Sequence, residues 1–186
     1  MDKIFVILGK TLAGKTTVLK EIEEKMNASR VITFTSRPKR EEEEAGVDYY
    51  FVSHDQALSF ILNGYSLANR QYKPHPSVGG FLPWYYGVLK EDLREPGNKV
   101  MITDIEGYKD LKEYQDVVSI YLHITPSEQS KRLSKRGEDL KEETLRRIED
   151  DDKVFDGFKE KADYVINVGQ SLDKVAKEVL EIINAE

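Results

Sequence analysis

The sequence predicts an α/β fold in which a central parallel sheet is flanked by helices. Short apolar runs of strand length alternate along the chain with segments whose apolar residues recur at helical spacing. The first run leads directly into a loop bordered by glycines and then into an amphipathic segment, which is the order of a βα unit. A chain of 186 residues is long enough for one sizeable core, so we expect a single domain over residues 1–186.

Five apolar runs are the predicted strands. They are rich in β-branched and aromatic residues, and they cover residues 4–8, 31–35, 100–103, 118–123 and 164–168.

Amphipathic segments at the two ends of the chain predict helices that cover the sheet. Residues 17–26 place four apolar side chains on one face, which are Val18, Leu19, Ile22 and Met26. The segment from Ser171 repeats Val175, Val179 and Ile183 at a spacing of four residues.

Two further helices are predicted from capping boxes, in which a hydroxyl and an acid or amide three residues later satisfy each other's backbone donors. Ser53 and Gln56 begin one helix, which Gly64 ends. Thr125 and Glu128 begin the other.

Residues 36–88 interrupt the alternation of strands and helices. They are rich in charge and tyrosine and contain a short strand of their own at 49–52, which predicts an inserted subdomain. A second irregular piece, residues 135–140, joins two helices and is basic at its start, which suits a mobile lid that we place at about 135–147.

Composition excludes several classes of protein. The net charge of −6 disfavours a general nucleic-acid binder. No stretch reaches the about 18 to 20 apolar residues of a membrane span, and the apolar run near the N-terminus is too short for a signal peptide, so we expect no membrane partner and no export. The absence of cysteine agrees with a reducing, cytoplasmic location. The three histidines lack metal-ligand spacing.

The loop after the first strand matches the P-loop pattern of two glycines five residues apart, followed by lysine and a hydroxyl residue. Backbone N–H groups and the positive end of the helix dipole would surround phosphates there. Lys15 would reach the β- and γ-phosphates of ATP, and the Thr16 hydroxyl would join the shell of a Mg²⁺ ion. The predicted ATP-binding residues are Gly9, Lys10, Thr11, Leu12, Ala13, Gly14, Lys15, Thr16 and Thr17.

Two arginines after the second run suggest a site for a further phosphate. Arg37 and Arg40 are three residues apart, and a planar guanidinium fork matches phosphate oxygens. Tyr49 and Tyr86 would add phenolic hydrogen bonds. The alternative is that both arginines merely offset the acidic run 41–44 on a solvated face, where such pairs contribute about 0 to 1 kcal/mol.

The segment around these arginines resembles the GMP-binding segment of the guanylate kinase family. From Thr33 it reads Thr-x-x-Ser-Arg-Pro-x-Arg, and Glu43, Gly46, Asp48, Tyr49 and Phe51 follow without a gap. The similarity continues at residues 85–87, 104–107, 132–137, 146–147 and 162–167.

This resemblance implies a P-loop kinase with a core sheet, a nucleoside-monophosphate-binding subdomain and a lid, which moves the γ-phosphoryl group of ATP to GMP. By position, Arg37, Arg40, Tyr49 and Tyr86 would hold the GMP phosphate, and Thr33 would contact the base. The implied partners are ATP with Mg²⁺ and GMP, in a monomer or homodimer.

Two acids and two further arginines are also carried over from the family by position. Asp104 and Glu106 would sit near the ribose, the base or the metal, since ligands bind beyond the carboxyl ends of strands in such sheets. Arg136 and Arg147 would reach the ATP phosphates. The alternatives are plain strand-end acids and solvated helix residues.

The positions that read guanine in the family differ in this chain. Leu67-Ala68-Asn69 stands where the family has an acid, Val88 replaces a hydroxyl residue, and residues 73–83 form an extra loop. Asn69, Arg70 or Gln71 are candidate substitutes. The acceptor therefore stays open among GMP, dGMP, another deoxynucleotide and ribose 1,5-bisphosphate. A non-catalytic binding module is disfavoured because Lys15 and Thr16 are intact.

Overall fold

The computed structural model describes residues 2–41, 43–73, 82–135 and 141–186. Five parallel strands form the central sheet in the order β2-β7-β1-β8-β9. Their bounds are β1 Ile4–Leu8, β2 Ser29–Arg30, β7 Lys99–Ile102, β8 Val117–His123 and β9 Tyr164–Asn167. The predicted α/β fold with a central parallel sheet is confirmed.

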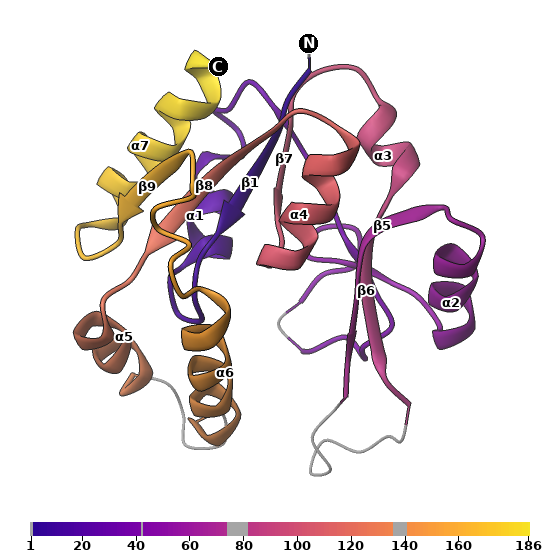
Figure 1. Ribbon diagram of the computed structural model, residues 1–186, viewed down its shortest axis with the longest axis horizontal. Coiled ribbons are helices and arrows are strands. Elements are labelled where there is room, and N and C mark those ends of the chain that lie inside the picture. The colour runs from indigo at the N-terminus through magenta and orange to yellow at the C-terminus, as the bar shows by residue number, and fades with distance from the viewer. Residues whose placement is uncertain (1, 42, 74–81, 136–140) are drawn as a thin grey trace.

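Helices cover both faces of this sheet (Figure 1). Phe5 and Ile7 of β1 face α1 (Lys15–Ile22) and α7 (Leu172–Ala185), while Ile4 and Val6 face α4 (Ile105–Tyr114). Successive strand residues point to opposite faces, so a fully buried strand needs an apolar residue at every position. β1 meets this requirement, since all five of its residues are buried.

The helices begin largely where the sequence predicts. α2 (His54–Leu62) starts after Ser53 with a complete capping box, and Gly64 follows its end in a left-handed conformation. Thr125 caps α5 (Pro126–Leu133) by accepting a hydrogen bond from the Glu128 N–H. α6 (Lys141–Val154) follows α5, and α3 (Lys90–Arg94) precedes β7.

Two terminal helices differ in how well their bounds were predicted. α7 buries the predicted stripe of Val175, Val179 and Ile183. α1 begins at Lys15 and ends at Ile22, earlier than the predicted 17–26, although Met26 packs against the same core.

A second sheet of four strands lies beside the first (Figure 1). Its order is β4-β3-β6-β5, with β3 Phe34–Thr35, β4 Tyr50–Phe51, β5 Ser66–Tyr72 and β6 Trp84–Leu89. Helix α2 packs on it, where the rings of Phe34 and Phe60 meet edge-on at 5.3 Å. The division of the chain into a core, a subdomain over 36–88 and a lid stays a prediction.

The predicted strand over 31–35 is wrong as one strand of the central sheet. The Val31 N–H still bonds to the Val100 carbonyl at 2.8 Å, beside β7. Phe34 and Thr35 belong to the second sheet, where they pair with β4 and β6. An apolar run shows that a segment is buried but not which sheet it joins, so the crossing between sheets was hidden.

Gly87 is the position of closest packing in the second sheet. A Cβ added there would lie 2.6 Å from Asn69 Oδ1 and 2.7 Å from the Phe34 ring. We expect Gly87→Ala to lower the free energy of unfolding by about 1–3 kcal/mol, as overpacking does. Urea denaturation measures this. Gly169→Ala is the control, because its nearest neighbour would be 3.3 Å away. Equal losses in both variants would exclude overpacking as the cause.

Candidate active site

The P-loop joins the buried end of β1 to the start of α1. Gly9 has no room for a side chain, since a Cβ would lie 2.8 Å from the Leu122 carbonyl oxygen of β8. Gly14 caps α1 with a left-handed φ of 88°, which glycine adopts without strain. Leu12 also has a positive φ, of 71°. The loop thus turns tightly enough to place Lys15, Thr16 and the helix dipole at one point.

Side chains of α5 hold the carbonyl groups of this loop. Arg132 Nη1 donates to the carbonyls of Leu12 and Ala13 at 3.0 and 3.2 Å, and Gln129 Nε2 donates to that of Thr11 at 2.9 Å. The N–H and C=O groups of one peptide unit point in opposite directions. Fixing the carbonyls toward α5 therefore fixes the direction of the N–H groups. Sequence reasoning gave neither Arg132 nor Gln129 this role.

Lys15 is half-buried and turns back over the loop. Its Nζ donates to the carbonyl of Gly9 and, at 3.3 Å, to that of Lys10. Burial is the main cause that lowers the pKa of Lys15 to about 8; Asp151 opposes this shift and the charge of Arg147 adds to it. The amine is therefore poised to gain a proton when an anion arrives. Thr16 and Thr17, in the first turn of α1, are exposed.

Helix α6 contacts the P-loop with two carboxylates that the sequence analysis did not single out. Asp151 accepts a hydrogen bond from the Thr11 N–H, and Asp152 pairs with Lys10 at 2.6 Å. One backbone donor of the loop is therefore occupied by an anionic side chain. The acidic run of α6 gave no signal of this, because acids in a helix usually face solvent.

Arg147, on the same helix, is exposed, and its charge acts on groups of both the P-loop and the second sheet. Burial is the main cause of the shifted pKa values of Lys15, Tyr49 and Tyr72, and the charge of Arg147 acts on all three groups. Its predicted contact with ATP phosphates stays a prediction. The other predicted lid arginine, Arg136, lies outside the described residues.

Arg37, Tyr49 and Tyr86 come together on the second sheet. Arg37 Nε donates to the Tyr86 hydroxyl at 3.2 Å, and its guanidinium lies 5.5 Å from the centre of the Tyr49 ring. The Arg37 side chain is 5% exposed and pairs with Glu43 at 2.6 Å. Arg37 therefore does pair with the acidic run 41–44, through Glu43, but it does so in a buried position and not on a solvated face.

Arg40 and Thr33 lie beside this cluster with fewer contacts. The Arg40 side chain is exposed, and its N–H bonds to Glu43 Oε2 at 2.9 Å. Glu43 thus ties the backbone of one arginine to the side chain of the other. Thr33 is half-buried and accepts a bond from the Tyr50 N–H through its carbonyl, at 3.0 Å.

Asp104 and Glu106 follow β7, and they differ in environment. Asp104 caps α4 and accepts bonds from Arg70 Nε at 2.9 Å and the Tyr72 hydroxyl at 3.1 Å. Glu106 is exposed and pairs with Lys109 on its own helix at 2.6 Å. The structure therefore brings Asp104, but not Glu106, into contact with the second sheet.

The two residues that depart from the family's guanine-reading positions are buried. Ala68 and Val88 are 5% and 0% exposed and belong to the apolar cluster between the sheets. A β-bulge lies between Leu67 and Arg70, and Ala68 has a positive φ of 51° there. Their side chains serve packing.

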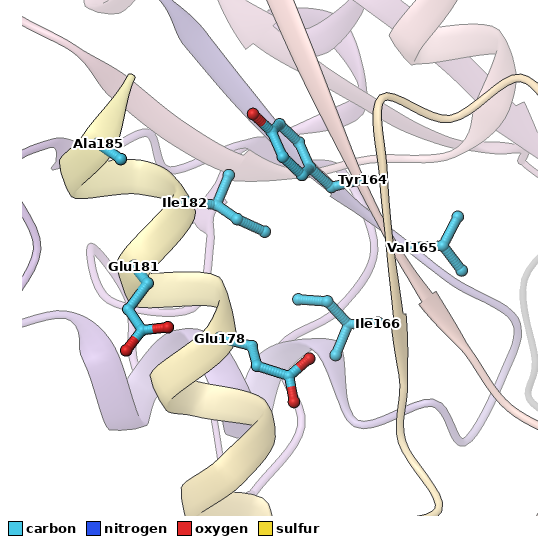
Figure 2. A pocket seen from close by; sticks show the side chains of 7 residues that line it. All are labelled: Tyr164, Val165, Ile166, Glu178, Glu181, Ile182 and Ala185. Carbon is cyan, nitrogen blue, oxygen red and sulfur yellow. The ribbon is translucent and has the colours of Figure 1, made fainter.

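A separate groove lies between β9 and α7, away from these residues. Tyr164, Val165 and Ile166 line one side and Glu178 and Ile182 the other, as Figure 2 shows. None of the predicted site residues lines it.

Protonation of Lys15 gives a test of the P-loop. Because phosphate favours the charged amine, ATP binding should raise the pKa of Lys15 from about 8, so the protein takes up a proton on binding near pH 8 to 9. Below about pH 7 the amine is already charged and uptake vanishes. Titration calorimetry in two buffers of different ionisation enthalpy measures this. Lys15→Arg should bind ATP without uptake; uptake equal to wild type would contradict the assignment.

Asp151 gives a second test. Asp151→Asn removes a negative charge from the P-loop while keeping an acceptor for the Thr11 N–H, so ATP should bind about three- to tenfold more tightly. Asp150→Asn is the matched control one residue away, since its side chain is 59% exposed and pairs with Arg146 at 3.7 Å. Equal effects of both substitutions on the Kd of ATP would show a general charge effect.

Comparisons with known proteins agree with this arrangement. The guanylate kinase family model matches residues 1–186. The chain is 30% identical to a guanylate kinase of Thermotoga maritima, with 99% of this chain and 87% of that protein aligned. It is 28% identical to a guanylate kinase of Fusobacterium nucleatum, over 98% of this chain and 96% of the relative.

A solved structure shares the fold. The crystal structure of guanylate kinase from Anaplasma phagocytophilum superposes with a TM-score of 0.67 at 23% identity, covering 99% of this chain and 85% of that one. Sequence, site and fold lead to one assignment: the chain belongs to the guanylate kinase family.

Proposed function

We propose that this protein transfers the γ-phosphoryl group of ATP to GMP. The observation that carries the proposal is the acceptor clamp, in which the buried Arg37 guanidinium is fixed against Glu43 and Tyr86 beside the Tyr49 ring. The chain also has a P-loop with Lys15 at the start of α1, so it offers one phosphate-binding group for ATP and a second for an acceptor nucleotide, as transfer between two nucleotides requires. The relatives that match over nearly the whole chain are named guanylate kinases.

The proposed mechanism relies on position and charge. Lys15 and the P-loop N–H groups would hold the β- and γ-phosphates, and Arg37 with Tyr49 and Tyr86 would hold the acceptor phosphate. An oxygen of the acceptor phosphate bonds to the γ-phosphorus, and the bond from that phosphorus to the β–γ bridging oxygen breaks, leaving ADP and GDP. The acceptor oxygen is already anionic at neutral pH, so no general base is needed.

Burial prepares the acceptor clamp for this role. The Arg37 guanidinium is fixed by Glu43, Tyr86 and the Pro38 carbonyl, the last at 2.7 Å. Burial, with the neighbouring Tyr86, raises the pKa of Tyr49, so its hydroxyl remains a hydrogen-bond donor at neutral pH. Preorganised donors need little rearrangement when a phosphate binds.

The residues present fit a Mg²⁺ ion that arrives with ATP. Thr16 offers an exposed hydroxyl in the first turn of α1, beside the phosphate loop. No cluster of three or more ligating side chains was found among the described residues, and Mg²⁺ usually relies on substrate phosphates and water for most of its shell. Bound there, the ion would neutralise phosphate charge. Asp104, the other predicted ligand, already has a cationic partner in Arg70.

The proposal also assigns an acceptor-binding subdomain and a lid to two segments of the chain. Residues 36–88 would form the acceptor-binding subdomain and residues around 135–147 the lid, and closure would exclude water from the reacting phosphates. Within the described part of the chain, no helix has the length and apolarity of a membrane span.

An acceptor screen tests the function. A coupled assay with ATP, Mg²⁺ and GMP, dGMP, AMP, dTMP, UMP or ribose 1,5-bisphosphate should show the highest kcat/KM with GMP or dGMP. Lys15→Ala should lower it by roughly 10²-fold or more, because a transition-state cation is lost. Lys25→Ala is the control, since Lys25 is an exposed lysine that pairs with Glu21, four residues away in the chain, at 3.5 Å. Preference for another acceptor, or near-normal turnover of Lys15→Ala, would overturn the proposal.

A further inference from the structure

The two phosphate-binding groups belong to different parts of the fold. Lys15 begins α1 of the central layer, whereas Arg37, Tyr49 and Tyr86 gather on the second sheet. Transfer between two bound nucleotides requires the reacting atoms to lie in line and about 3 to 3.5 Å apart. The contacts that fix the second sheet on the central layer therefore bear on the transfer step.

One ion pair joins α1 to the turn that precedes β4. Lys20, in the last turn of α1, pairs through its Nζ with Asp48 Oδ1 at 2.9 Å. Asp48 directly precedes Tyr49 in the chain, and the Tyr49 ring lies beside the Arg37 guanidinium. The helix that begins with Lys15 is thus connected by this ion pair to the acceptor clamp.

Asp48 is fixed in its own turn before it meets the lysine. The Glu44 N–H donates to Asp48 Oδ2 at 2.9 Å, and the Gly46 N–H donates to the Tyr49 carbonyl at 3.0 Å. The hydrogen bond from Glu44 is the main cause that lowers the pKa of Asp48, and Lys20 lowers it further, against the effect of burial. The carboxylate side chain is only 12% exposed. Because one partner is already ordered, the pair costs less side-chain entropy than one between two mobile side chains.

The opposite edge of the second sheet is attached to the central layer in a similar way. The strand order β4-β3-β6-β5 places β4 and β5 at its two edges. On β5, Arg70 pairs with Asp104 at 2.9 Å and with Asp110 at 3.1 Å, at the cap and in the body of α4. Ala68 of β5 and Ile105 of α4 belong to one apolar cluster. The β5 edge is therefore held by packing and charge together, and the Lys20–Asp48 pair connects the β4 side to α1.

We propose that Lys20 and Asp48 are positioning residues, which hold the acceptor clamp at the distance and angle from the P-loop that in-line transfer requires. The inference rests on the proposed function. Lys20 lies five residues after Lys15, about 7.5 Å further along the helix, and neither member of the pair is among the groups assigned to a phosphate. The pair should therefore act on the alignment of two bound nucleotides and not on the binding of either one alone.

Lys20→Met is the main test, because it removes the charge and leaves the turn around Asp48 intact. With ATP, Mg²⁺ and GMP all saturating, the single-turnover rate of transfer should fall about two- to fivefold, as for one partly exposed ion pair. The Kd of ATP alone and of GMP alone, from calorimetry, should stay within about 1.5-fold of wild type. At about 1 M salt, where charges are screened beyond about 3 Å, the wild-type and variant rates should converge.

Asp48→Asn completes the cycle, since its amide oxygen still accepts from the Glu44 N–H while the charge is lost. Because the two residues act as one pair, the double variant should be no slower than either single variant. Lys25→Met is the matched control, because it removes an exposed lysine that pairs locally with Glu21, and it should leave the transfer rate unchanged.

Three outcomes would overturn the inference while the proposed function stands. They are an unchanged transfer rate in Lys20→Met, additive losses in the double variant, and a rise in the Kd of GMP alone that accounts for the whole fall in rate. A wild-type protein that transfers no phosphoryl group to GMP would overturn the proposed function and the inference together, so the two failures are told apart by the wild-type measurement.

Discussion

The direction of the P-loop N–H groups is the constraint on which the rest of the site depends. Strand β1 is buried along its whole length, and it delivers the loop to a fixed point at the edge of the sheet. Arg132 and Gln129 then hold the loop carbonyls from behind. A phosphate-binding loop held only by its own turns would have to order itself on each binding event, at a cost in conformational entropy. Here the cost is met during folding.

The acceptor side follows a different physical rule. Its main cation, Arg37, is buried against Glu43, and burying a charge is tolerated only when it is paired and hydrogen-bonded. Such a pair adds little to stability in general, yet it restricts the guanidinium to one orientation. Asp104 and Arg70 repeat the arrangement on the neighbouring strand and helix. The second sheet therefore presents Arg37 and Arg70 already oriented, because each of the two is bound to a carboxylate.

The sequence predicted the parts of this molecule that depend on local pattern. The runs of β1, β8 and β9 and the stripe on α7 are confirmed, because burial in a sheet or against it leaves a periodic trace. The gathering of Arg37, Tyr49 and Tyr86 was proposed from residue types that suit a phosphate, and the family resemblance supported it over the alternative of a solvated face. Contacts of Asp151 with Thr11, and of Arg70 with Asp104, join residues 140 and 34 positions apart. Nothing in a local stretch of sequence reports such a pairing, and the split of 31–35 between two sheets was missed for the same reason.

Helix α6 presents a cation and an anion one turn apart, Arg147 and Asp151, toward the same loop. The acids of this helix therefore offset part of the positive charge at a loop that is predicted to receive phosphates. A substitution that strengthens the contacts of Asp151 and Asp152 with the loop would raise the thermal stability of the nucleotide-free protein. The same substitution would lower its affinity for nucleotide, because these carboxylates occupy the loop. Thermal stability and nucleotide affinity therefore place opposite requirements on the side chains of this helix.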